Sequence, residues 1–476
     1  MRSIYLLSPR DLSPETIAVA FAKTSRSPES FRDIVEELSD EKSAKFHEKW
    51  VVGYGHASVA EHAVLHVAIE NVSRLAIECI ESNRLASYTE KSTRYQKWDP
   101  DGYFTPRRLA ASRHAAVYGE TCARLFDAYH RSLEPLLRLM RERYPRKEGE
   151  SEARWDGRIR SKYVDVSRYL LPMSALANVG MTANARVLES AIRKMLSHPL
   201  EEVREIGAEV KKVALAETPT LVKYAESAPY LAETEAGLRA WGAEPEAEGI
   251  AAGGRSVEGA VRLVGYEADG EDRFLAACLF RFGEASIEQA LAAVQAMPAE
   301  QRAELAEAAL GRLGRHDTPL RELEHVTYTF EAVMDQGAYF EVKRHRMMTQ
   351  TPQRLTARLG YAAPRAIDDA GFREAYDEAM RAAAEAYEEI AADFPEEAAY
   401  VVPNGFNRRL LMTLNLRELF HFCELRGAAN AHFAVRRIAG QMHALAARVH
   451  PALARFMRVG EYARWQEIEA EYFAAV

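Results

Sequence analysis

The sequence predicts an α+β fold made of two tandem copies of one domain, each copy a mixed sheet packed with long helices. One succession of motifs occurs twice at nearly constant spacing. Strand-like and helical segments also mix without the regular βαβ order of a parallel sheet. A stretch rich in Gly, Ala, Glu and Pro separates the repeats. We therefore expect a first copy over residues 1–235, a linker over 236–255 and a second copy over 256–476.

The first copy opens with the apolar segment 3–8, which is typical of a short strand, and with a helical stretch over 15–24. The β-branched segment VLHVAIE at 64–70 predicts a strand. Apolar residues at helical spacing predict helices in three further stretches: 71–86, 112–144 and, after a turn-rich start, 167–198. The second of these is long and amphipathic.

The second copy repeats this order after a segment of its own. That segment holds an expected strand over 260–268 and helical patterns over 274–283 and 286–295. Residues 315–346 then parallel 55–84, and residues 400–427 parallel 169–196. The offsets between matching residues are 263 for His62 and His325, 262 for Arg84 and Arg346, and 231 for both Pro172 with Pro403 and Asn184 with Asn415. The register therefore holds at both ends, with about 30 residues deleted between them in the second copy.

Composition excludes several classes of function. The net charge of −8 argues against non-specific binding of nucleic acid, because such binding needs clustered positive charge. No run of about 18 apolar residues predicts a membrane span, and the N-terminus lacks the apolar run of a signal peptide. Four cysteines, none in a CxxC pair, indicate buried thiols of a reducing cytoplasm, with neither a metal site nor a disulfide framework: Cys79, Cys122, Cys278 and Cys423.

Two segments look like damaged halves of one motif. Residues 82–95 read SNRLASYTEKSTRY, and residues 344–358 read RHRMMTQTPQRLTAR. Together they resemble the flavin-dependent thymidylate synthases, whose signature is Arg-His-Arg, seven residues, then Ser-x-Arg. The resemblance covers most of both copies. It implies conversion of dUMP to dTMP with methylenetetrahydrofolate, FAD and NADPH, by homotetramers whose active sites lie between subunits.

The two copies lack different parts of this motif. In the first copy, Ser82 and Asn83 stand where the family has Arg and His, and Met195 replaces a late Arg. In the second copy, counting seven residues past Arg346 places Arg354 at the Ser position, although a two-residue insertion would instead align residues 356–358 (TAR). Ala399 replaces the Arg that precedes the family's Pro.

The surviving residues are those that the resemblance implies are functional. Substrate binding is expected from Glu90, Ser92, Arg94, Arg168, Arg344 and Arg426, and catalysis from Ser92, Arg344 and His345. Cofactor binding is expected from Ser58, Glu61, Asn184, Arg186, Thr318, Glu324, His345, Arg346, Asn415, Arg417 and His421. No metal site is expected. Arginine suits this substrate because its planar fork binds phosphate bidentately and also donates to a uracil carbonyl.

Because the two copies lack complementary parts of the motif, we predict one composite active site per chain, built from the intact half of each copy. Two fused chains would then supply four domains, as many as the family's homotetramer contains, so we expect a homodimer. The halves of the motif that have lost their charged residues predict a second pocket that is unable to hold a phosphate dianion. This pocket is expected to contain Ser82, Asn83, Met195, Arg354 and Ala399. Two alternatives remain at this stage: an inactive flavin- or nucleotide-binding regulator, and a flavin- and folate-dependent methylase of another pyrimidine.

Overall fold

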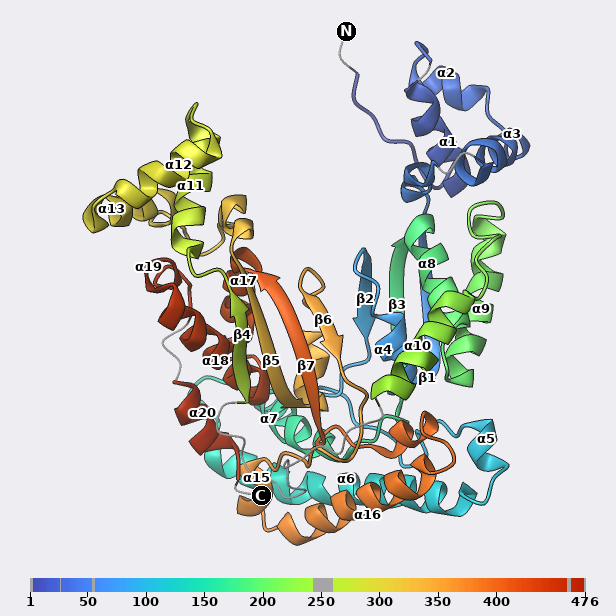
Figure 1. Ribbon diagram of the computed structural model, residues 1–476. Coiled ribbons are helices and arrows are strands. Elements are labelled where there is room, and N and C mark those ends of the chain that lie inside the picture. The colour runs from blue at the N-terminus through green and yellow to red at the C-terminus, as the bar shows by residue number, and fades with distance from the viewer. Residues whose placement is uncertain (1–2, 26, 54–55, 243–259, 460–463, 475–476) are drawn as a thin grey trace.

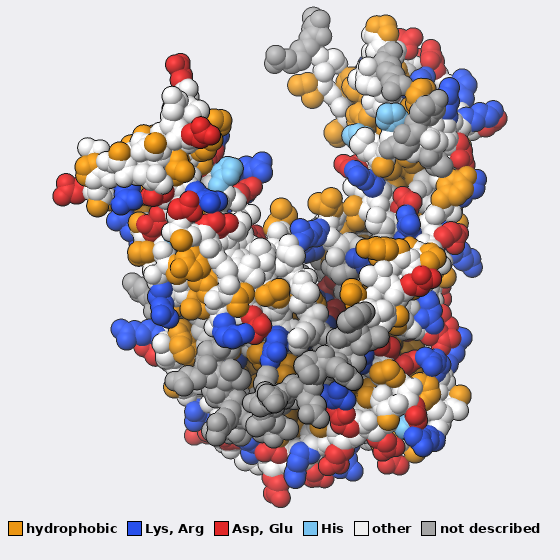
Figure 2. Space-filling view, in the orientation of Figure 1, with side chains coloured by type: hydrophobic (Ala, Val, Ile, Leu, Met, Phe, Trp, Pro, Cys, Tyr) orange, Lys and Arg blue, Asp and Glu red, His pale blue; other side chains and the backbone are white. Residues whose placement is uncertain are grey.

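The computed structural model describes residues 1–476 except 1–2, 26, 54–55, 243–259, 460–463 and 475–476. The two copies form two arms that rise from a common base, where the long helices α6 (Ala115–Arg143) and α16 (Arg373–Ala391) pack against each other (Figure 1). The space-filling view shows a deep notch between the upper parts of the arms (Figure 2).

The first copy has three strands and nine α-helices besides α6 among its described residues. The strands are β1 (Val64–Ser73), β2 (Ala86–Glu90) and β3 (Leu176–Asn184). The helices are α1 (Pro14–Thr24), α2 (Phe31–Glu36), α3 (Asp40–His47), α4 (Arg74–Ile80), α5 (Arg107–Ala110), α7 (Glu152–Ser167), α8 (Ala185–Leu196), α9 (Glu201–Glu217) and α10 (Pro229–Gly242). Two short 3-10 turns, η2 (Ala57–His62) and η3 (Arg168–Leu170), precede β1 and β3.

The second copy has four strands and nine α-helices besides α16 in the part that the structure describes. The strands are β4 (Val261–Tyr266), β5 (Thr327–Asp335), β6 (Thr349–Pro352) and β7 (Asn407–Asn415). The helices are α11 (Gly270–Phe282), α12 (Ile287–Ala296), α13 (Ala299–Leu310), α14 (Gln336–Val342), α15 (Arg365–Asp369), α17 (Leu416–Arg426), α18 (Phe433–Val449), α19 (Pro451–Ala454) and α20 (Trp465–Tyr472). The 3-10 turns η4 (Arg321–His325) and η5 (Glu397–Val401) match η2 and η3.

The two sheets share one topology. The first has the order β1-β3-β2, and the second has β4-β5-β7-β6, so β4 is an added edge strand. All pairings between these strands are antiparallel, which confirms the α+β class but corrects the expectation of mixed sheets. The pairing register is the same in both copies: Ser87 faces Thr182, and Thr349 faces Thr413, offset by 262 and 231 residues.

A β-bulge explains why the offset between the copies changes from 263 to 262. Strand β1 pairs regularly with β3 up to Ile69 and resumes at Val72, whereas β5 pairs with β7 without interruption. The first copy thus holds one extra residue there. Asn71 takes a positive φ of 56° within the bulge, and its N–H donates to the Asn178 side chain. The insertion ends before α4, so the motif that follows keeps its place.

A pseudo-twofold axis relates the copies at the base of the arms. Pro172 forms an antiparallel bridge with Pro403, its own counterpart. The flanking hydrogen bonds obey the same symmetry: Met173 N–H donates to the Val402 carbonyl, and Asn404 N–H to the Leu171 carbonyl, each at 3.0 Å. One chain therefore builds internally the self-complementary interface of a twofold dimer.

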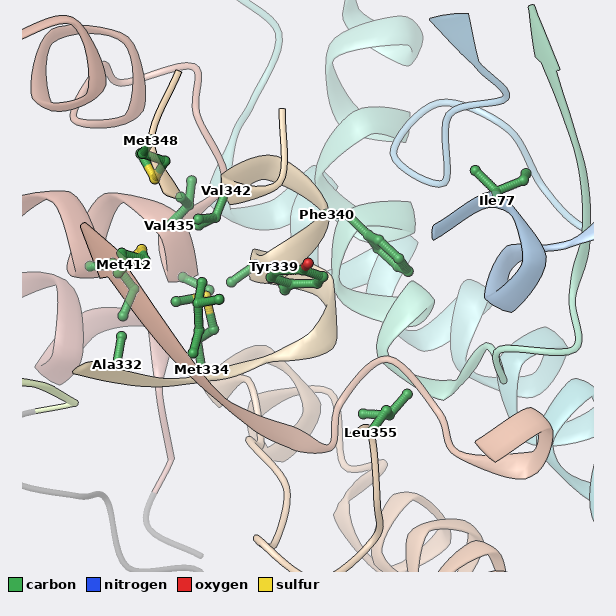
Figure 3. Close-up of a cluster of buried hydrophobic side chains, with 14 of the residues drawn as sticks. Ile77, Ala332, Met334, Tyr339, Phe340, Val342, Met348, Leu355, Met412 and Val435 are labelled. Carbon is green, nitrogen blue, oxygen red and sulfur yellow. The ribbon is translucent and has the colours of Figure 1, made fainter. Parts of the chain in front are cut away.

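Helix α14 is packed on both sides, which fixes the residues that follow it. Val342 packs into the second copy's core, beside Val435 of α18, and Phe340 extends toward the first copy (Figure 3). The helix starts where Asp335 accepts a hydrogen bond from Ala338 N–H, at 2.8 Å. Residues 344–347, directly after this helix, are held in place as a result.

Four expectations about local structure are wrong. Residues 3–8 form no strand, because nothing pairs with them and Ile4 and Leu6 are exposed. Within 71–86 only α4 is helical, since β1 continues to Ser73. The turn-rich start of 167–198 contains the central strand β3, whose outward residues Asn178 and Gly180 are typical of turns and obscured its alternation. Helix α10 continues to Gly242, so the linker cannot begin at 236; residues 243–255 of it lie outside the described residues.

The four thiols are unpaired, and three of them are buried. Burial raises the pKa of Cys79 to about 12 and that of Cys122 to about 11, so both are protonated at neutral pH. Among the described helices, none combines the length and the apolar character needed to cross a bilayer.

Candidate functional site

One cavity between the copies is lined by residues of both, and we call it the composite cavity. Its volume is about 160 Å³. Its lining includes all six residues expected to bind substrate: Glu90, Ser92, Arg94 and Arg168 from the first copy, and Arg344 and Arg426 from the second. Six further residues complete the lining: Arg74, Lys91, Thr93, Tyr95, Phe340 and Glu341. Two incomplete motifs thus meet around one space within a single chain.

The Ser92–Arg94 segment enters the cavity from the end of an edge strand. Strand β2 ends at Glu90, and the chain then turns sharply. The Ser92 hydroxyl accepts a hydrogen bond from the Arg94 N–H at 3.2 Å, which closes the turn. This contact orients Ser92. No described group acts as a base on its hydroxyl, so a nucleophilic role has no structural support.

Arg94 is held between carboxylates of the two copies. Its Nε donates to Asp165 of α7 at 3.1 Å, and its Nη1 lies 3.5 Å from Glu341 of α14. Asp165 also pairs with Arg168 at 3.0 Å. Burial raises the pKa of Asp165 even though both arginines oppose that effect. The guanidinium of Arg94 is therefore fixed before any ligand arrives, so little ordering entropy remains to be lost on binding.

Arg168 is the most buried arginine predicted to bind substrate, with 2% exposure. It follows directly after α7, which places Asp165 one turn before it on the same face. Its Nη1 donates to the Thr93 hydroxyl at 3.2 Å. Its Nη2 has no hydrogen-bond partner among the described residues, which leaves a donor available to a ligand.

Arg426 is positioned by a short chain of contacts within the second copy. Its Nε donates to His345 at 2.9 Å, and its Nη1 lies 3.1 Å from Glu341. The other ring nitrogen of His345 lies 3.0 Å from Glu418. Burial lowers the pKa of His345, so its neutral ring accepts from Arg426 at neutral pH. His345 lies behind the cavity wall, so the structure indicates a positioning role and not contact with substrate.

A buried ion pair forms the floor of the composite cavity. Arg74 lies 2.8 Å from Glu90 and stacks over the Phe340 ring at 4.0 Å. Burial opposes the ionised form of Glu90, but Arg74 and the surrounding cations outweigh it and hold its pKa below the ordinary value. The pair is therefore charged, and it joins the first copy's motif to the second copy's α14.

Arg344 differs from the other cavity arginines because it is free. It has no hydrogen bond and no ion pair with any residue that the structure describes, and it is exposed at the cavity. Arg94, Arg168, Arg426 and Arg74 each have a carboxylate partner. An incoming anion therefore meets one uncompensated guanidinium, with four preoriented ones behind it.

Residues of the expected cofactor group in the second copy line a larger cavity of about 630 Å³, the α17 cavity. Its lining includes Thr318, Glu324, Asn415, Arg417 and His421, with Met347 from the turn after α14. Asn415 and Arg417 at the α17 N-terminus line this space, and Arg315 and Arg458 add positive charge. This donor set suits the diphosphate of a dinucleotide such as FAD.

The recurring Asn and Arg residues also have structural roles. Asn184 and Asn415 cap α8 and α17 by accepting from the N–H three residues later, each at 2.9 Å. Arg417 pairs with Glu324 at 3.0 Å, as Arg186 does with Glu61 in the first copy. Ser58 lies exposed in η2 beside that pair. Capping and pairing explain these residues without a cofactor, although those of the second copy do line the α17 cavity.

A second cavity between the copies, the degenerate cavity, lies at the position related to the composite cavity by the pseudo-twofold axis. Its volume is about 470 Å³. Ser82, Arg354 and Ala399 line it as expected, and Arg346 lines it instead of the α17 cavity. The sequence predicted a pocket without paired cations, and this prediction is wrong. Seven lysines and arginines line it, and four of them, Lys194, Arg239, Lys343 and Arg408, come from positions outside the two motif segments; the other three are Arg84, Arg346 and Arg354.

The structure also settles the alignment of the second motif. Thr356 accepts from the Arg358 N–H at 3.3 Å, as Ser92 does from Arg94. Residues 356–358 are therefore the counterpart of Ser-x-Arg, with two residues inserted, and counting straight to Arg354 was wrong. The Arg358 side chain pairs with Glu388 on α16 at 2.8 Å, away from the degenerate cavity.

Sequence reasoning missed four charged residues at the composite cavity: Arg74, Lys91 and Glu341, which line it, and Asp165, which pairs with Arg94 and Arg168. Asp165 stands three residues before Arg168, a spacing that places both on one helical face and could have been noticed. Arg74 and Glu341 gave no such signal, because their partners are distant in sequence.

Comparison with known proteins places the chain in a family. The sequence profile described as "Thymidylate synthase complementing protein" matches residues 8–220 and again 262–452. The chain belongs to this family. It carries two copies of the family's domain, and the relatives that it matches over most of its length share this size.

A UPF0159 protein of Chlamydia muridarum is 32% identical over 445 residues, which covers 90% of this chain and 83% of the relative. The UPF0159 protein Ta1429 of Thermoplasma acidophilum is 28% identical, with coverage of 90% and 91%. A flavin-dependent thymidylate synthase of Clostridium tetani is 30% identical over 219 residues and covers 44% of this chain and 82% of its own. That enzyme is thus comparable to one copy.

Two solved structures of single-copy proteins also match. The flavin-dependent thymidylate synthase ThyX of Helicobacter pylori, complexed with FAD and dUMP, has a TM-score of 0.31 and 18% identity. It covers 41% of this chain and 98% of its own. The UMP/dUMP methylase PolB of Streptomyces cacaoi has a TM-score of 0.33 and 22% identity, with coverage of 41% and 93%.

Proposed function

We propose that the protein is a flavin-dependent thymidylate synthase that methylates dUMP to dTMP, with methylenetetrahydrofolate and NADPH as co-substrates, at one composite cavity per chain. The observation that carries the proposal is the convergence of Ser92, Arg94 and Arg168 with Arg344 and Arg426 around one space. Each half alone supplies only two of these four arginines. Together they supply the donors for a phosphate dianion and for a pyrimidine carbonyl.

The arginines perform two tasks in this proposal. Free Arg344 and the spare donors of Arg168 neutralise phosphate. A second guanidinium donates to a pyrimidine carbonyl, where negative charge grows as carbon 5 becomes nucleophilic. Because Arg94 and Arg426 are already held by Asp165 and Glu341, little rearrangement accompanies this change in charge. Ser92 hydrogen-bonds substrate and does not act as a nucleophile.

The α17 cavity is where FAD would be held. Arg417, Arg458 and the α17 N-terminus would bind its diphosphate. FAD supplies hydride transfer when bound. The second copy's own residues connect the two spaces: Arg344 lines the composite cavity, buried His345 lies between, and Met347 lines the α17 cavity.

Glu341 favours a second candidate, methylation of another pyrimidine monophosphate. It is a buried carboxylate, 4% exposed, whose Oε1 accepts no hydrogen bond from the described residues. Such an acceptor suits the N3–H of uracil and equally the amino group of cytosine. A substrate panel of dUMP, UMP and dCMP decides between the two candidates.

The experiment is complementation of a thymidine auxotroph, followed by analysis of purified protein with FAD, NADPH and methylenetetrahydrofolate. Growth and formation of dTMP are expected. Turnover of UMP or dCMP but not dUMP would establish the second candidate. Flavin absorbance and nucleotide binding without turnover would indicate a regulator. A protein with no flavin absorbance, no nucleotide binding and no turnover would refute the proposal.

We also propose a cytoplasmic homodimer. Helices cover one face of each sheet, whereas on the other face β1 and β7 leave Val64 and Leu411 exposed among the described residues. A second chain placed there would cover both faces and bring the number of domains to four. Unpaired thiols agree with a reducing compartment.

A further inference from the structure

The degenerate cavity has changed its charges and has not simply lost them. Neutral residues stand in place of five cations of the composite cavity: Gln336, Gln353, Ala399, Ser82 and Met195 replace Arg74, Lys91, Arg168, Arg344 and Arg426. The counterpart of the sixth, Arg358, is directed toward Glu388. A site in decay would now be neutral. Seven cations and four carboxylates nevertheless line this cavity.

Four of the seven cations are paired and form two networks at the walls. Lys343 and Arg408 pair with Glu81 and Glu78, at 2.8 and 2.6 Å. Arg239 and Arg354 share Glu396, and Arg239 also pairs with Glu235. These networks hold the two copies together and leave little net charge.

The other three cations have no carboxylate partner among the described residues, and they gather around one turn, residues 82–84. The Lys194 ammonium donates to the Ser82 hydroxyl and the Asn83 side-chain oxygen at 3.0 and 2.9 Å. The Arg346 Nε donates to the Arg84 carbonyl at 3.2 Å. Arg84 donates across the junction to Thr349 at 3.1 Å. Three positive charges are therefore balanced only by neutral oxygens.

We propose that the degenerate cavity binds a nucleoside polyphosphate, with its phosphates on Lys194, Arg84 and Arg346. Three uncompensated cations match the charge of a di- or triphosphate better than that of a monophosphate, because an anion taken out of water needs paired charges. An apolar floor beside them offers a surface for a base: Leu75, Tyr339, Met348 and Leu355. The volume of about 470 Å³ falls within the range of about 300–1,000 Å³ usual for small-molecule pockets.

This site would lie next to the proposed active site without sharing its ligands. Arg346 lines the degenerate cavity, and Arg344, two residues earlier, lines the composite cavity. The inference does not rest on the proposed function, since a polyphosphate can occupy this cavity whether or not the chain methylates dUMP.

The test is calorimetric titration of the full chain with dTTP, ATP and inorganic tripolyphosphate, each with saturating dUMP present. One saturable dTTP site per chain is expected. Lys194→Ala and Arg84→Ala should weaken it by about ten-fold or more, since each removes a charge-assisted contact. Arg193→Ala is the matched control, because Arg193 is the exposed neighbour of Lys194 on α8, and it should leave binding unchanged. Should Arg84→Ala not fold, Lys194→Ala alone decides.

A chemical readout locates the ligand independently of dUMP binding. Burial lowers the pKa of Lys194, so a larger share of its amine is unprotonated and open to acetylating reagents than for an ordinary lysine at the same pH. dTTP should protect Lys194 and leave exposed Lys212 labelled as before. Absence of saturable binding, or equal binding by the Lys194→Ala variant, would overturn the proposal. Tripolyphosphate binding as tightly as dTTP would overturn the nucleoside part.

Discussion

Arg94→Ala is the substitution that tests the composite cavity most directly. Arg94 is the side chain that contacts carboxylates of both copies, Asp165 at 3.1 Å and Glu341 at 3.5 Å. Its removal takes one guanidinium from the six cations of the cavity and breaks the ionic contact that joins the two motif halves there.

The expected losses of dUMP affinity and of stability follow from the contacts that remain in the Arg94→Ala variant. A charge-assisted contact to phosphate or carbonyl contributes about 1.5–3 kcal/mol, so dUMP binding should weaken by about ten-fold or more. Stability should fall less than the roughly 3–5 kcal/mol of an ion left without any partner. Asp165 keeps Arg168, and Glu341 keeps Arg426.

Titration calorimetry with dUMP measures the first effect, and denaturant unfolding measures the second. Arg354→Ala is the control: it removes an arginine of the degenerate cavity that pairs with Glu396, so dUMP binding should stay nearly unchanged. If both variants bind dUMP equally well, or lose affinity equally, the division into composite and degenerate cavities is wrong.

Glu341→Gln should tighten dUMP binding, because it removes a negative charge that competes with phosphate for Arg94 and Arg426. Calorimetry at low salt measures this affinity. Weaker binding would instead show that Glu341 accepts a hydrogen bond from the pyrimidine. The folded protein should lose stability in acid, because burial lowers the pKa of His345 and lowers that of His432 well below the ordinary 6.5. The unfolded chain therefore binds these protons first, so stability is full above about pH 6.5 and declines as the pH falls toward the folded-state pKa values; a melting temperature that stays constant down to pH 5 would contradict this. Calorimetry with dUMP should give one site per chain, and two equivalent sites would show that the degenerate cavity takes the same ligand. Light scattering should show a dimer of 53.4 kDa chains, which a stable monomer would exclude.

The sequence predicted the class of the fold and which residues line the composite cavity, because both depend on patterns repeated at fixed spacing. It could not predict β3, since the outward residues Asn178 and Gly180 are typical of a turn, and only the pairing with β1 and β2 on either side shows a strand. It also misjudged the degenerate cavity. Counting motif positions shows which arginines are missing, but not that Lys194 and Arg408 enter from positions with no role in the motif.

Fusion explains how one cavity could change while the other was kept. In an assembly of identical chains, a substitution alters every site at once. Here the two cavities use different residues of one chain, so Ser82 and Arg344, equivalent in the motif, are free to differ. The turn 344–347 contributes residues to all three cavities: Arg344 lines the composite cavity, Arg346 the degenerate cavity and Met347 the α17 cavity. A ligand that moves Arg346 therefore acts one peptide away from His345, which positions Arg426. A duplicated chain can in this way build a regulatory site from the second copy of its own active site.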